Sequence, residues 1–369
     1  MTLTVGVIGA GQLARMMIPP AVELGLELRV LAASEGESAR VAVTALGSHT
    51  DAEAVAAFAR DVDVVTFDHE HVPQPVLRAL EAEGVAVRPG ADALRFAQDK
   101  LVMRRRLTEL GLPVPEWAEV ATQEELAAFL AEHGGAAVVK TPRGGYDGKG
   151  VRLVRDAAEA ADWFGDGPLL AEELVEFRRE LAALVARRPN GDIAAWPVVE
   201  TVQRDGVCVE VLAPAPDADE RLQEVATQVA ATIARELDVT GVLAVELFET
   251  TDQRILVNEL AMRPHNSGHW TIDGAATSQF EQHLRAVLDL PLGPTVPRAP
   301  WTVMINVLGG VDDVTARFEA AWSDQPDVKL HFYGKGARPG RKVGHVTAWG
   351  DDLEETVFRA RAAAAFFQG

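Results

Sequence analysis

Two glutamates interrupt apolar runs in the second half of the chain. Glu246 lies within Val242–Phe248, and Glu259 lies within Ile255–Leu260. An isolated carboxylate among buried apolar residues is costly unless it is paired or coordinated. The two runs predict a hairpin that would bring both carboxylates to one face, where they could hold a hard cation such as Mg²⁺. Surface positions on an edge strand are the alternative explanation.

The segment Lys140–Gly150 is a candidate phosphate site. It places a lysine at the end of an apolar strand and follows it with a loop that contains four glycines, Arg143 and Lys149. Glycine permits positive φ and lets backbone N–H groups approach anionic oxygens closely. The spacing is not that of a Walker A loop, because a strand follows rather than a helix. We therefore predict a flap over phosphates between two strands, with a flexible surface hairpin as the alternative.

Two further polar segments could bind anions. Arg263–His269 follows the second glutamate directly and is rich in hydrogen-bond donors, and the absence of a nearby cysteine disfavours zinc at its histidines. Lys335–Lys342 has four basic residues and no acid, and its glycines and Pro339 predict a tight loop. This second segment favours a phosphomonoester site over a solvated surface.

The N-terminal glycine motif gives a weaker signal. Gly9–Ala14 fits GxGxxA directly after a strand, which is compatible with a dinucleotide, a simpler phosphate or only a tight turn. The acidic cluster Asp68–His71 follows another strand, and ligands often bind at the carboxyl ends of parallel strands. A nicotinamide oxidoreductase is one interpretation of the glycine motif taken with Glu35, an acidic residue just beyond the second strand where a ribose-binding carboxylate could lie.

The elements that would position these residues alternate between strand and helix at first. Strands at Leu3–Ile8, Leu28–Ala32, Val62–Phe67 and Val85–Arg88, separated by helices, predict a parallel sheet. One long helix is expected over Ala91–Leu110. Later candidates are strands at Val138–Lys140, Val151–Val154, Leu169–Glu172, Glu180–Ala186, Ala194–Val199, Gly241–Glu249, Ile255–Leu260, Trp301–Leu308, Val328–Tyr333 and His345–Ala348, and helices at Asp217–Leu237 and from Asp351.

Composition sets outer limits on function. The chain has 369 residues, 35 basic and 55 acidic side chains and a formal net charge of −20, which argues against general binding to nucleic acid or an anionic membrane. Its single cysteine, Cys208, allows no intrachain disulfide. No signal-like N-terminus and no membrane-length apolar stretch is evident. We expect a cytoplasmic protein of two or three domains.

Taken in order, six stretches resemble one known family. They are Gly9–Met16, Thr66–Val72, Gly144–Gly150, Asn258–His269, Tyr333–Lys335 and Gly340–His345. They are similar to those of the 5-(carboxyamino)imidazole ribonucleotide synthases, ATP-grasp carboxylate–amine ligases of purine biosynthesis. The resemblance covers nearly the whole chain, and Asn258–His269 is its most specific part.

The resemblance implies a mixed α/β and α+β architecture. An ATP-grasp fold would follow an N-terminal Rossmann-like domain with a parallel sheet (residues 1–95). A lid domain with its preceding helix (96–205) and an ATP-grasp C domain with a small C-terminal substrate-loop subdomain (206–369) would complete the chain. ATP and Mg²⁺ are the implied cofactors, and bicarbonate and 5-aminoimidazole ribonucleotide the implied substrates. Carboxyphosphate is the implied intermediate, and a homodimer is expected.

The resemblance also implies a role for each matching residue. ATP binding is expected at Lys100, Lys140, Gly145, Tyr146, Asp147, Gly148, Lys149, Gly150, Val151, Glu172, Glu173, Leu174, Val175, Glu180, Gln203, Asn258 and Glu259. Ribonucleotide binding is expected at Glu70, Tyr146, Asp147, Lys335, Arg338 and Arg341. The implied catalytic residues are Lys335, Arg263, His265, Asn266 and Ser267, and the implied Mg²⁺ ligands are Glu246 and Glu259.

Three other functions compete with this one. A related ATP-grasp ligase, such as a formate-dependent glycinamide ribonucleotide transformylase, is disfavoured by Asn266–His269 and by the basic loop. A nicotinamide oxidoreductase would leave the flap, the glutamate pair and the basic loop unexplained. A non-catalytic nucleotide-binding regulator is disfavoured because Lys140, Glu246 and Glu259 are all present.

Overall fold

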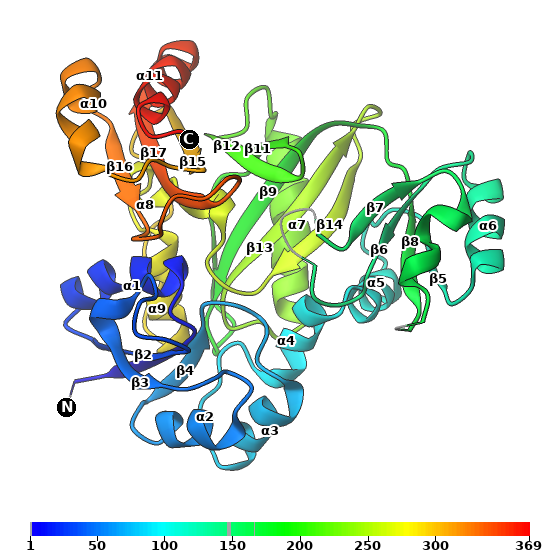
Figure 1. The fold of residues 1–369 in the computed structure, drawn as a ribbon, viewed down its shortest axis with the longest axis horizontal. Helices are drawn as coiled ribbons and strands as arrows, with labels where there is room; N and C mark the ends of the chain where they lie inside the picture. Colours follow the sequence, from blue (N-terminus) through cyan, green and yellow to red (C-terminus); the bar gives the residue numbers. More distant parts are fainter. Residues whose placement is uncertain (1, 146–148, 166) are drawn as a thin grey trace.

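Three sheets organise the molecule (Figure 1). The computed structural model describes residues 2–145, 149–165 and 167–369. A four-stranded sheet near the N-terminus and a second four-stranded sheet lie on different sides of a nine-stranded central sheet. This arrangement leaves a space between the sheets in which segments from all parts of the chain can meet.

The N-terminal sheet is parallel, as predicted, with the order β3-β2-β1-β4. Its elements are β1 (Thr4–Ile8), α1 (Gln12–Glu23), β2 (Glu27–Ala32), η1 (Arg40–Ala42), β3 (Val43–Leu46), α2 (Ala52–Ala59), β4 (Val64–Phe67) and α3 (Gln74–Ala82). The expected strand over Val85–Arg88 is wrong, since this segment forms only an isolated bridge between Val65 and Val87. Strand β3 was not foreseen, because its four half-exposed residues carry little hydrophobic pattern.

The single long helix expected over Ala91–Leu110 is in fact two helices. Helix α4 (Ala91–Gln98) ends at Asp99, and α5 (Lys100–Glu109) begins directly after it. Asp99 has an extended backbone, and its carboxylate accepts hydrogen bonds from the N–H groups of Leu101 and Val102. A side chain that caps the next helix in this way interrupts the first one. The break places Lys100 at the start of α5.

The second four-stranded sheet is antiparallel, with the order β5-β8-β6-β7. It contains β5 (Trp117–Val120), α6 (Gln123–Glu132), β6 (Ala137–Lys140), β7 (Val151–Val154), η2 (Ala157–Trp163) and β8 (Leu169–Glu173). Lys140 pairs with Val151 in register, which confirms that two strands flank the glycine-rich loop.

The central sheet has the order β14-β13-β9-β11-β12-β15-β17-β16, and β10 pairs with β9. Its first strands are β9 (Phe177–Arg187), β10 (Ile193–Ala195), β11 (Val199–Arg204), β12 (Val207–Ala213), β13 (Gly241–Thr250) and β14 (Ile255–Ala261). The expected strand over Ala194–Val199 is split between β10 and β11 around buried Trp196. Helix α7 (Glu220–Glu236) packs apolar residues such as Ile233 against Leu243 and Val245 of the sheet.

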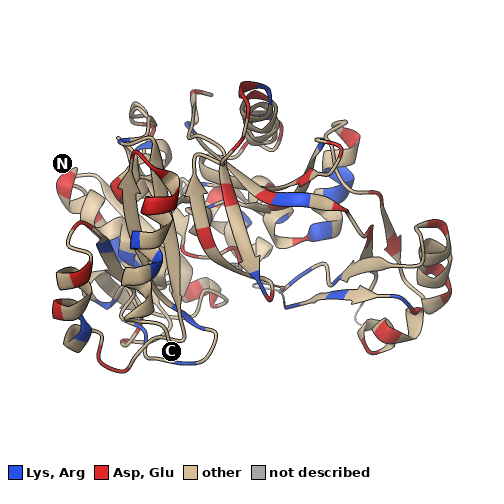
Figure 2. Cartoon of the chain, turned by 90° about the horizontal axis from the view of Figure 1, so that it is seen from above, with Lys and Arg blue, Asp and Glu red and all other residues tan. Residues whose placement is uncertain are grey.

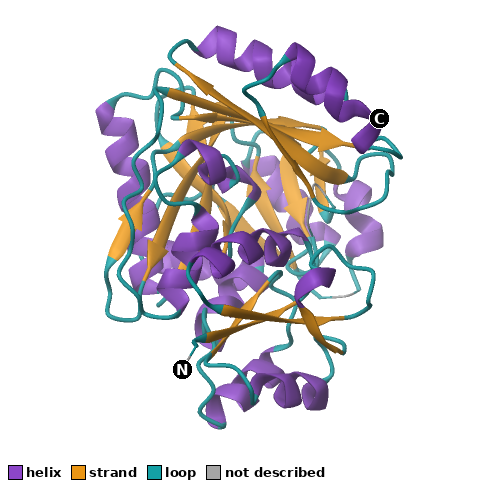
Figure 3. Ribbon diagram, turned by 90° about the vertical axis from the view of Figure 1, so that its left-hand side faces the viewer, coloured by secondary structure: helices purple, strands orange, loops and turns teal. Residues whose placement is uncertain are grey.

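The last part of the chain completes this sheet. Its elements are η3 (Asn266–Gly268), α8 (Thr271–Gly274), α9 (Gln279–Val287), β15 (Trp301–Leu308), η4 (Thr315–Arg317), α10 (Phe318–Asp324), β16 (Lys329–Phe332), β17 (Lys342–Gly350) and α11 (Leu353–Ala365). Figure 3 shows α11 lying along the strands near the C-terminus, and its contacts are with β15 and β17. Strands β9 to β11, which fall within the expected 96–205 segment, pair with the central sheet.

Figure 2 shows acidic residues on the outer helices, and both acidic and basic residues along the strands and inner loops. Within the described part of the chain, no helix is both long and apolar enough to cross a membrane.

Candidate active site

A cleft of about 1430 Å³ lies between the three sheets. It receives residues from the turn before α1, from the segment after β4, from the start of α5, from the ends of β6 and β7, and from β13, β14 and the basic loop. Of the residues singled out from the sequence, the cleft is lined by Glu70, Lys100, Lys140, Gly145, Val151, Glu180, Gln203, Glu246, Asn258, Glu259, Arg263, His265, Asn266 and Lys335. Residues that are distant in the sequence therefore face one space.

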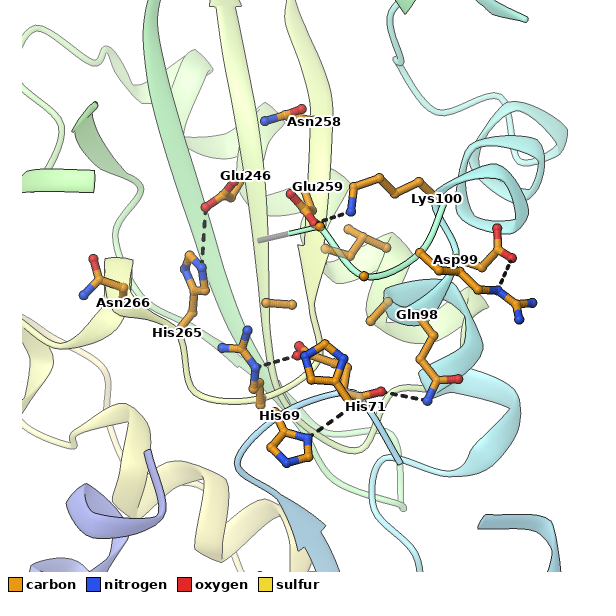
Figure 4. A pocket seen from close by; sticks show the side chains of 18 of the residues that line it. His69, His71, Gln98, Asp99, Lys100, Glu246, Asn258, Glu259, His265 and Asn266 are labelled. Atoms are coloured by element: carbon orange, nitrogen blue, oxygen red, sulfur yellow. Dashed lines mark hydrogen bonds and ion pairs between the residues drawn. The ribbon is translucent and has the colours of Figure 1, made fainter. Parts of the chain in front are cut away.

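The carboxylate pair is formed by register. Glu246 of β13 and Glu259 of β14 are direct partners in the antiparallel ladder, as the predicted hairpin requires, and both line the cleft (Figure 4). Burial, together with the negative charges of Glu259 and Glu180, raises the pKa of Glu246 to about 7. The charge of Glu259 hinders the ionisation of Glu246, and a cation bound between the two carboxylates would relieve this repulsion. No set of three or more His, Cys, Asp or Glu side chains among the described residues could hold a metal ion.

Two lysines stand beside this pair. Lys100 Nζ lies 3.1 Å from Glu259 Oε1. Lys140 Nζ lies 2.6 Å from Glu172 Oε2 and donates a hydrogen bond of 3.0 Å to Asn258 Oδ1. These contacts bring positive charge from two separate elements to the wall of the cleft that carries the carboxylates.

Glu172 is held by a cation that the sequence did not reveal. Arg104 of α5 is fully buried, forms an ion pair with Glu172 and donates hydrogen bonds to the carbonyl oxygens of Val257 (2.7 Å) and Asn258 (3.0 Å). Burial alone would raise the pKa of Glu172, but Lys140 and Arg104 hold it below its ordinary value. The side chain of Glu172 therefore joins the lid to β14 rather than lining the cleft.

The segment after β14 meets the N-terminal sheet. Arg263 Nε donates a 2.7 Å hydrogen bond to Glu70 Oε2, and Glu70 raises the pKa of this guanidinium against the effect of burial. His265 Nε2 lies 3.5 Å from Glu246 Oε1, and its Nδ1 lies 2.9 Å from Ser267 Oγ. Burial, with Arg263 and Lys342 nearby, lowers the pKa of His265 to about 3. The imidazole is therefore neutral near pH 7.

The side chain of Asn266 is held in place by hydrogen bonds to a neighbouring strand. Its amide exchanges two hydrogen bonds with Asn306 of β15, at 3.0 and 2.7 Å, and Asn306 donates a third to the carbonyl of Cys208. Both asparagines are buried. Ser267 is buried as well and lies outside the lining of the cleft.

The glycine motif at the N-terminus does not present a free anion site. The carboxylate of Asp68 accepts hydrogen bonds from the backbone N–H of Gly11 (3.0 Å) and Ala14 (2.8 Å), so it occupies the start of α1. A Cβ at position 11 would overlap this carboxylate. The dinucleotide interpretation of the motif is wrong, because the chain's own carboxylate takes the place that a pyrophosphate would need.

The basic loop faces the cleft only in part. Lys335 lines it, donates a hydrogen bond to Gln12 Oε1 of α1 and lies 5.7 Å from the ring centre of Tyr333. Arg338 and Arg341 are exposed and do not line the cleft. Lys342, the last basic residue of the loop, also lines it. Two of the four basic residues of the loop therefore line the cleft, and the other two lie outside its lining.

The remaining ATP candidates lie on the central sheet, at the end of β8 and in the loop before β7. Glu180 of β9 is hydrogen-bonded to Gln203 of β11, and burial raises the pKa of Glu180. Glu173 ends β8, and Leu174 and Val175 connect it to β9. Lys149 and Gly150 precede β7 and lie outside the lining. Tyr146, Asp147 and Gly148 lie outside the described residues.

Comparison with protein families agrees with this geometry. Residues 1–98 match the ribonucleotide synthetase preATP-grasp domain, 105–280 the ATP-grasp domain, and 302–359 the phosphoribosylaminoimidazole carboxylase C-terminal domain. The fold and the cleft are therefore those of an ATP-grasp ligase.

Comparison with individual proteins shows which family of ATP-grasp ligases this chain resembles. N5-carboxyaminoimidazole ribonucleotide synthase of Mycobacterium tuberculosis is 53% identical over 98% of this chain and 86% of its own length, and that of Corynebacterium ammoniagenes is 49% identical over 98% and 91%. Of the solved structures, the Thermus thermophilus synthetase has a TM-score of 0.89 at 39% identity, covering 98% of each chain. The Aspergillus clavatus synthase in complex with ADP and 5-aminoimidazole ribonucleotide has a TM-score of 0.90 at 33% identity, covering 99% of this chain and 98% of its own. The chain belongs to the N5-carboxyaminoimidazole ribonucleotide synthase family.

Several residues of the site were missed from the sequence. Arg104 lies in a helix with three consecutive arginines, so nothing marked it as the buried one. Gln12 lies within the glycine motif, and the sequence did not indicate that its side chain accepts a hydrogen bond from Lys335. A signal was available for Asn306, a lone amide within the apolar run Trp301–Leu308, since a buried polar side chain needs a partner.

Proposed function

We propose that this protein carboxylates 5-aminoimidazole ribonucleotide with bicarbonate at the expense of ATP, forming N5-carboxyaminoimidazole ribonucleotide, ADP and phosphate in purine biosynthesis. The observation that carries the proposal is one cleft that joins the Glu246–Glu259 pair and two lysines to the Arg263–Asn266 segment and to Lys335. Family membership supports the same reaction.

We place the triphosphate between the carboxylate pair and the lysines Lys100 and Lys140. The residues present fit a bound Mg²⁺, because Glu246 and Glu259 are adjacent oxygen donors whose mutual repulsion a cation would relieve. When bound there, Mg²⁺ would neutralise phosphate charge during transfer. Two protein carboxylates leave the remaining coordination positions to phosphate oxygens and water. Gly145 and Val151, on either side of the residues that the structure does not describe, both line the cleft, and we place this loop beside the phosphates.

The first chemical step forms carboxyphosphate. A bicarbonate oxygen attacks the γ-phosphorus of ATP, the bond from that phosphorus to the β–γ bridging oxygen breaks, and ADP leaves. We place the two anions beside the guanidinium of Arg263 and the imidazole of His265, both of which line the cleft. Holding reactants in line accounts for much of the acceleration in such a transfer, and preorganised donors account for most of the rest.

The second step transfers the carboxyl group. The substrate amine attacks the carboxyl carbon of carboxyphosphate, or of CO₂ released from it within the cleft. With carboxyphosphate, the C–N bond forms as the bond from carbon to the phosphate oxygen breaks. With CO₂ that bond has already broken, and the amine adds to the free molecule. In either case the released phosphate can accept the proton that the amine loses. We place the ribonucleotide beside Glu70 and Lys335, on the side of the cleft next to α1. Arg338 and Arg341 are placed at its outer rim, where they are exposed to solvent.

The decisive assay follows ADP release with each substrate omitted in turn. Full turnover is expected only when ATP, Mg²⁺, bicarbonate and 5-aminoimidazole ribonucleotide are all present. Rapid turnover with formate and glycinamide ribonucleotide in their place would refute the proposal in favour of the transformylase alternative. A homodimer, a cytoplasmic location and the lack of a nucleic-acid partner stay predictions from the sequence.

A further inference from the structure

Gln279, the first residue of α9, is completely buried behind the Arg263–Ser267 segment. Its Oε1 accepts a hydrogen bond of 2.8 Å from the backbone N–H of His265, and its Nε2 donates one of 2.8 Å to the carbonyl oxygen of the same residue. One side-chain amide therefore satisfies both backbone groups of His265, much as a neighbouring strand would.

The second N–H of this amide forms a hydrogen bond with His269. Gln279 Nε2 lies 2.9 Å from His269 Nδ1. Because Oε1 must face the N–H of His265, the NH₂ group must face the other two partners, and Nδ1 must accept. His269 is then a neutral ring that carries its proton on Nε2, in agreement with the lowering of its pKa by burial. The orientation of the amide is determined by its surroundings.

The segment is built around this contact. Thr271 Oγ1 accepts from the backbone N–H of Gln279 (2.8 Å) and donates to the carbonyl of Gly268 (2.6 Å). A Cβ at position 268 would overlap both the Gln279 amide and Leu184, so glycine is required for the close approach. Gln279 itself does not line the cleft, whereas His265 does.

We propose that Gln279 and His269 form a positioning clamp that sets the backbone and side chain of His265 for the bicarbonate step. This inference rests on the proposed function. The clamp holds His265 at both backbone groups, which directs its imidazole toward Glu246 and Ser267. Because Arg263 and Asn266 lie on either side of His265 in the chain, the clamp also fixes the backbone from which their side chains extend. Neither clamp residue touches the reacting atoms, so both act through the segment they hold.

Helix α9 supplies a matched control. Gln282 is equally buried and bonds the backbone of Gly293 in the same two-way manner, with both hydrogen bonds at 2.8 Å. Neither Gln282 nor Gly293 lines the cleft. Methionine is close to glutamine in size but cannot make either bond, so Gln279→Met and Gln282→Met remove comparable contacts from one helix. Only the first removal affects the proposed clamp.

The test titrates bicarbonate at saturating ATP and 5-aminoimidazole ribonucleotide, with ADP release as the readout, for the full-length chain. Gln279→Met should lose roughly 10²-fold in kcat/KM for bicarbonate, with the KM for ATP close to that of the wild type. Gln282→Met should resemble the wild type, although both variants should melt at lower temperature. Equal kinetics for the two variants would overturn the clamp, as would a matching rise in the KM for ATP.

Variants of His269 keep the inference testable if Gln279→Met fails to fold. The Oδ1 of His269→Asn can accept from Gln279 in place of Nδ1, whereas His269→Leu cannot. His269→Asn should retain bicarbonate kinetics that His269→Leu loses, and equal loss in both would overturn the proposed hydrogen-bond role. Absence of bicarbonate-dependent turnover in the wild type would instead refute the proposed function, so the two failures are distinguishable.

Discussion

Replacement of Glu172 by glutamine should destabilise the protein through two buried cations. Glu172 is 3% exposed and lies between Arg104 and Lys140, which are 0% and 7% exposed. Removing one partner of a buried ion pair costs about 3–5 kcal/mol, because an uncompensated charge remains. Glutamine keeps one oxygen acceptor, so we expect a loss near the lower end, about 3 kcal/mol. The free energy of urea unfolding, compared at equal m-value, measures it.

A neighbouring pair provides the control. Arg105 and Glu119 also join α5 to the lid sheet, but their side chains are 50% and 35% exposed. Exposed ion pairs contribute about 0–1 kcal/mol, so Glu119→Gln should be almost neutral. Losses of the same size in Glu172→Gln and Glu119→Gln, both below about 1 kcal/mol, would refute the argument from burial.

The effect of Glu172→Gln should also depend on pH in one direction. The pKa of Glu172 in the folded protein lies below its ordinary value, since Lys140 and Arg104 outweigh burial. The carboxylate therefore stabilises the fold fully above its unfolded pKa of about 4.3, and this contribution is lost as pH falls through the folded pKa. The difference between wild type and variant should be full at neutral pH and shrink only in acid. A difference that grew on acidification would contradict the assigned charge state.

Three further predictions concern the cleft. The affinity for Mg²⁺ should weaken as pH falls below about 7, because the raised pKa of Glu246 makes protons compete with the cation. The substitution Glu259→Gln should abolish Mg²⁺-dependent turnover while the circular dichroism spectrum stays unchanged. A pH-independent affinity, or an active Glu259→Gln, would remove the metal from this pair. Lys335→Ala should raise the KM for 5-aminoimidazole ribonucleotide far more than that for ATP, whereas equal increases would place this lysine elsewhere. Gly11→Ala should cost about 1–3 kcal/mol through overlap with Asp68, and an unchanged melting temperature would count against that packing.

Local chemistry was readable from the sequence wherever a few adjacent residues carry it. The hairpin of Glu246 and Glu259, the strands on either side of the glycine-rich loop and the parallel N-terminal sheet were predicted from alternation, glycines and strand–helix order, and the structure confirms them. The hairpin and the two strands beside the loop depend on contacts between residues close in the chain, which hydrophobic periodicity records. The parallel sheet joins more distant strands, and the alternation of strands and helices predicts it. The resemblance to the family could also be found from the sequence, because it depends on the residues alone.

The ends of helices and strands were less predictable where a single side chain determined them. Asp99 divides a helix that periodicity alone makes continuous, because its carboxylate caps the next turn. The segment Val85–Arg88 has strand composition but adds no full strand to the sheet. At Asp99 the deciding interaction is one side-chain cap, which is too small to alter the hydrophobic pattern.

Only the tertiary structure decided which polar residues line the cleft and which hold the fold together. Arg104 and Glu172 are charged residues in ordinary sequence surroundings, yet burial against Lys140 makes them part of the framework. Asp68 fills the glycine turn that a nucleotide could otherwise have used, and Gln279 reaches His265 from a different helix. Such contacts join residues far apart in the chain, and each depends on the packing of several elements at once. Residue types and motifs determined what kind of chemistry this protein can perform, whereas the packing of its sheets determined which side chains are placed to perform it.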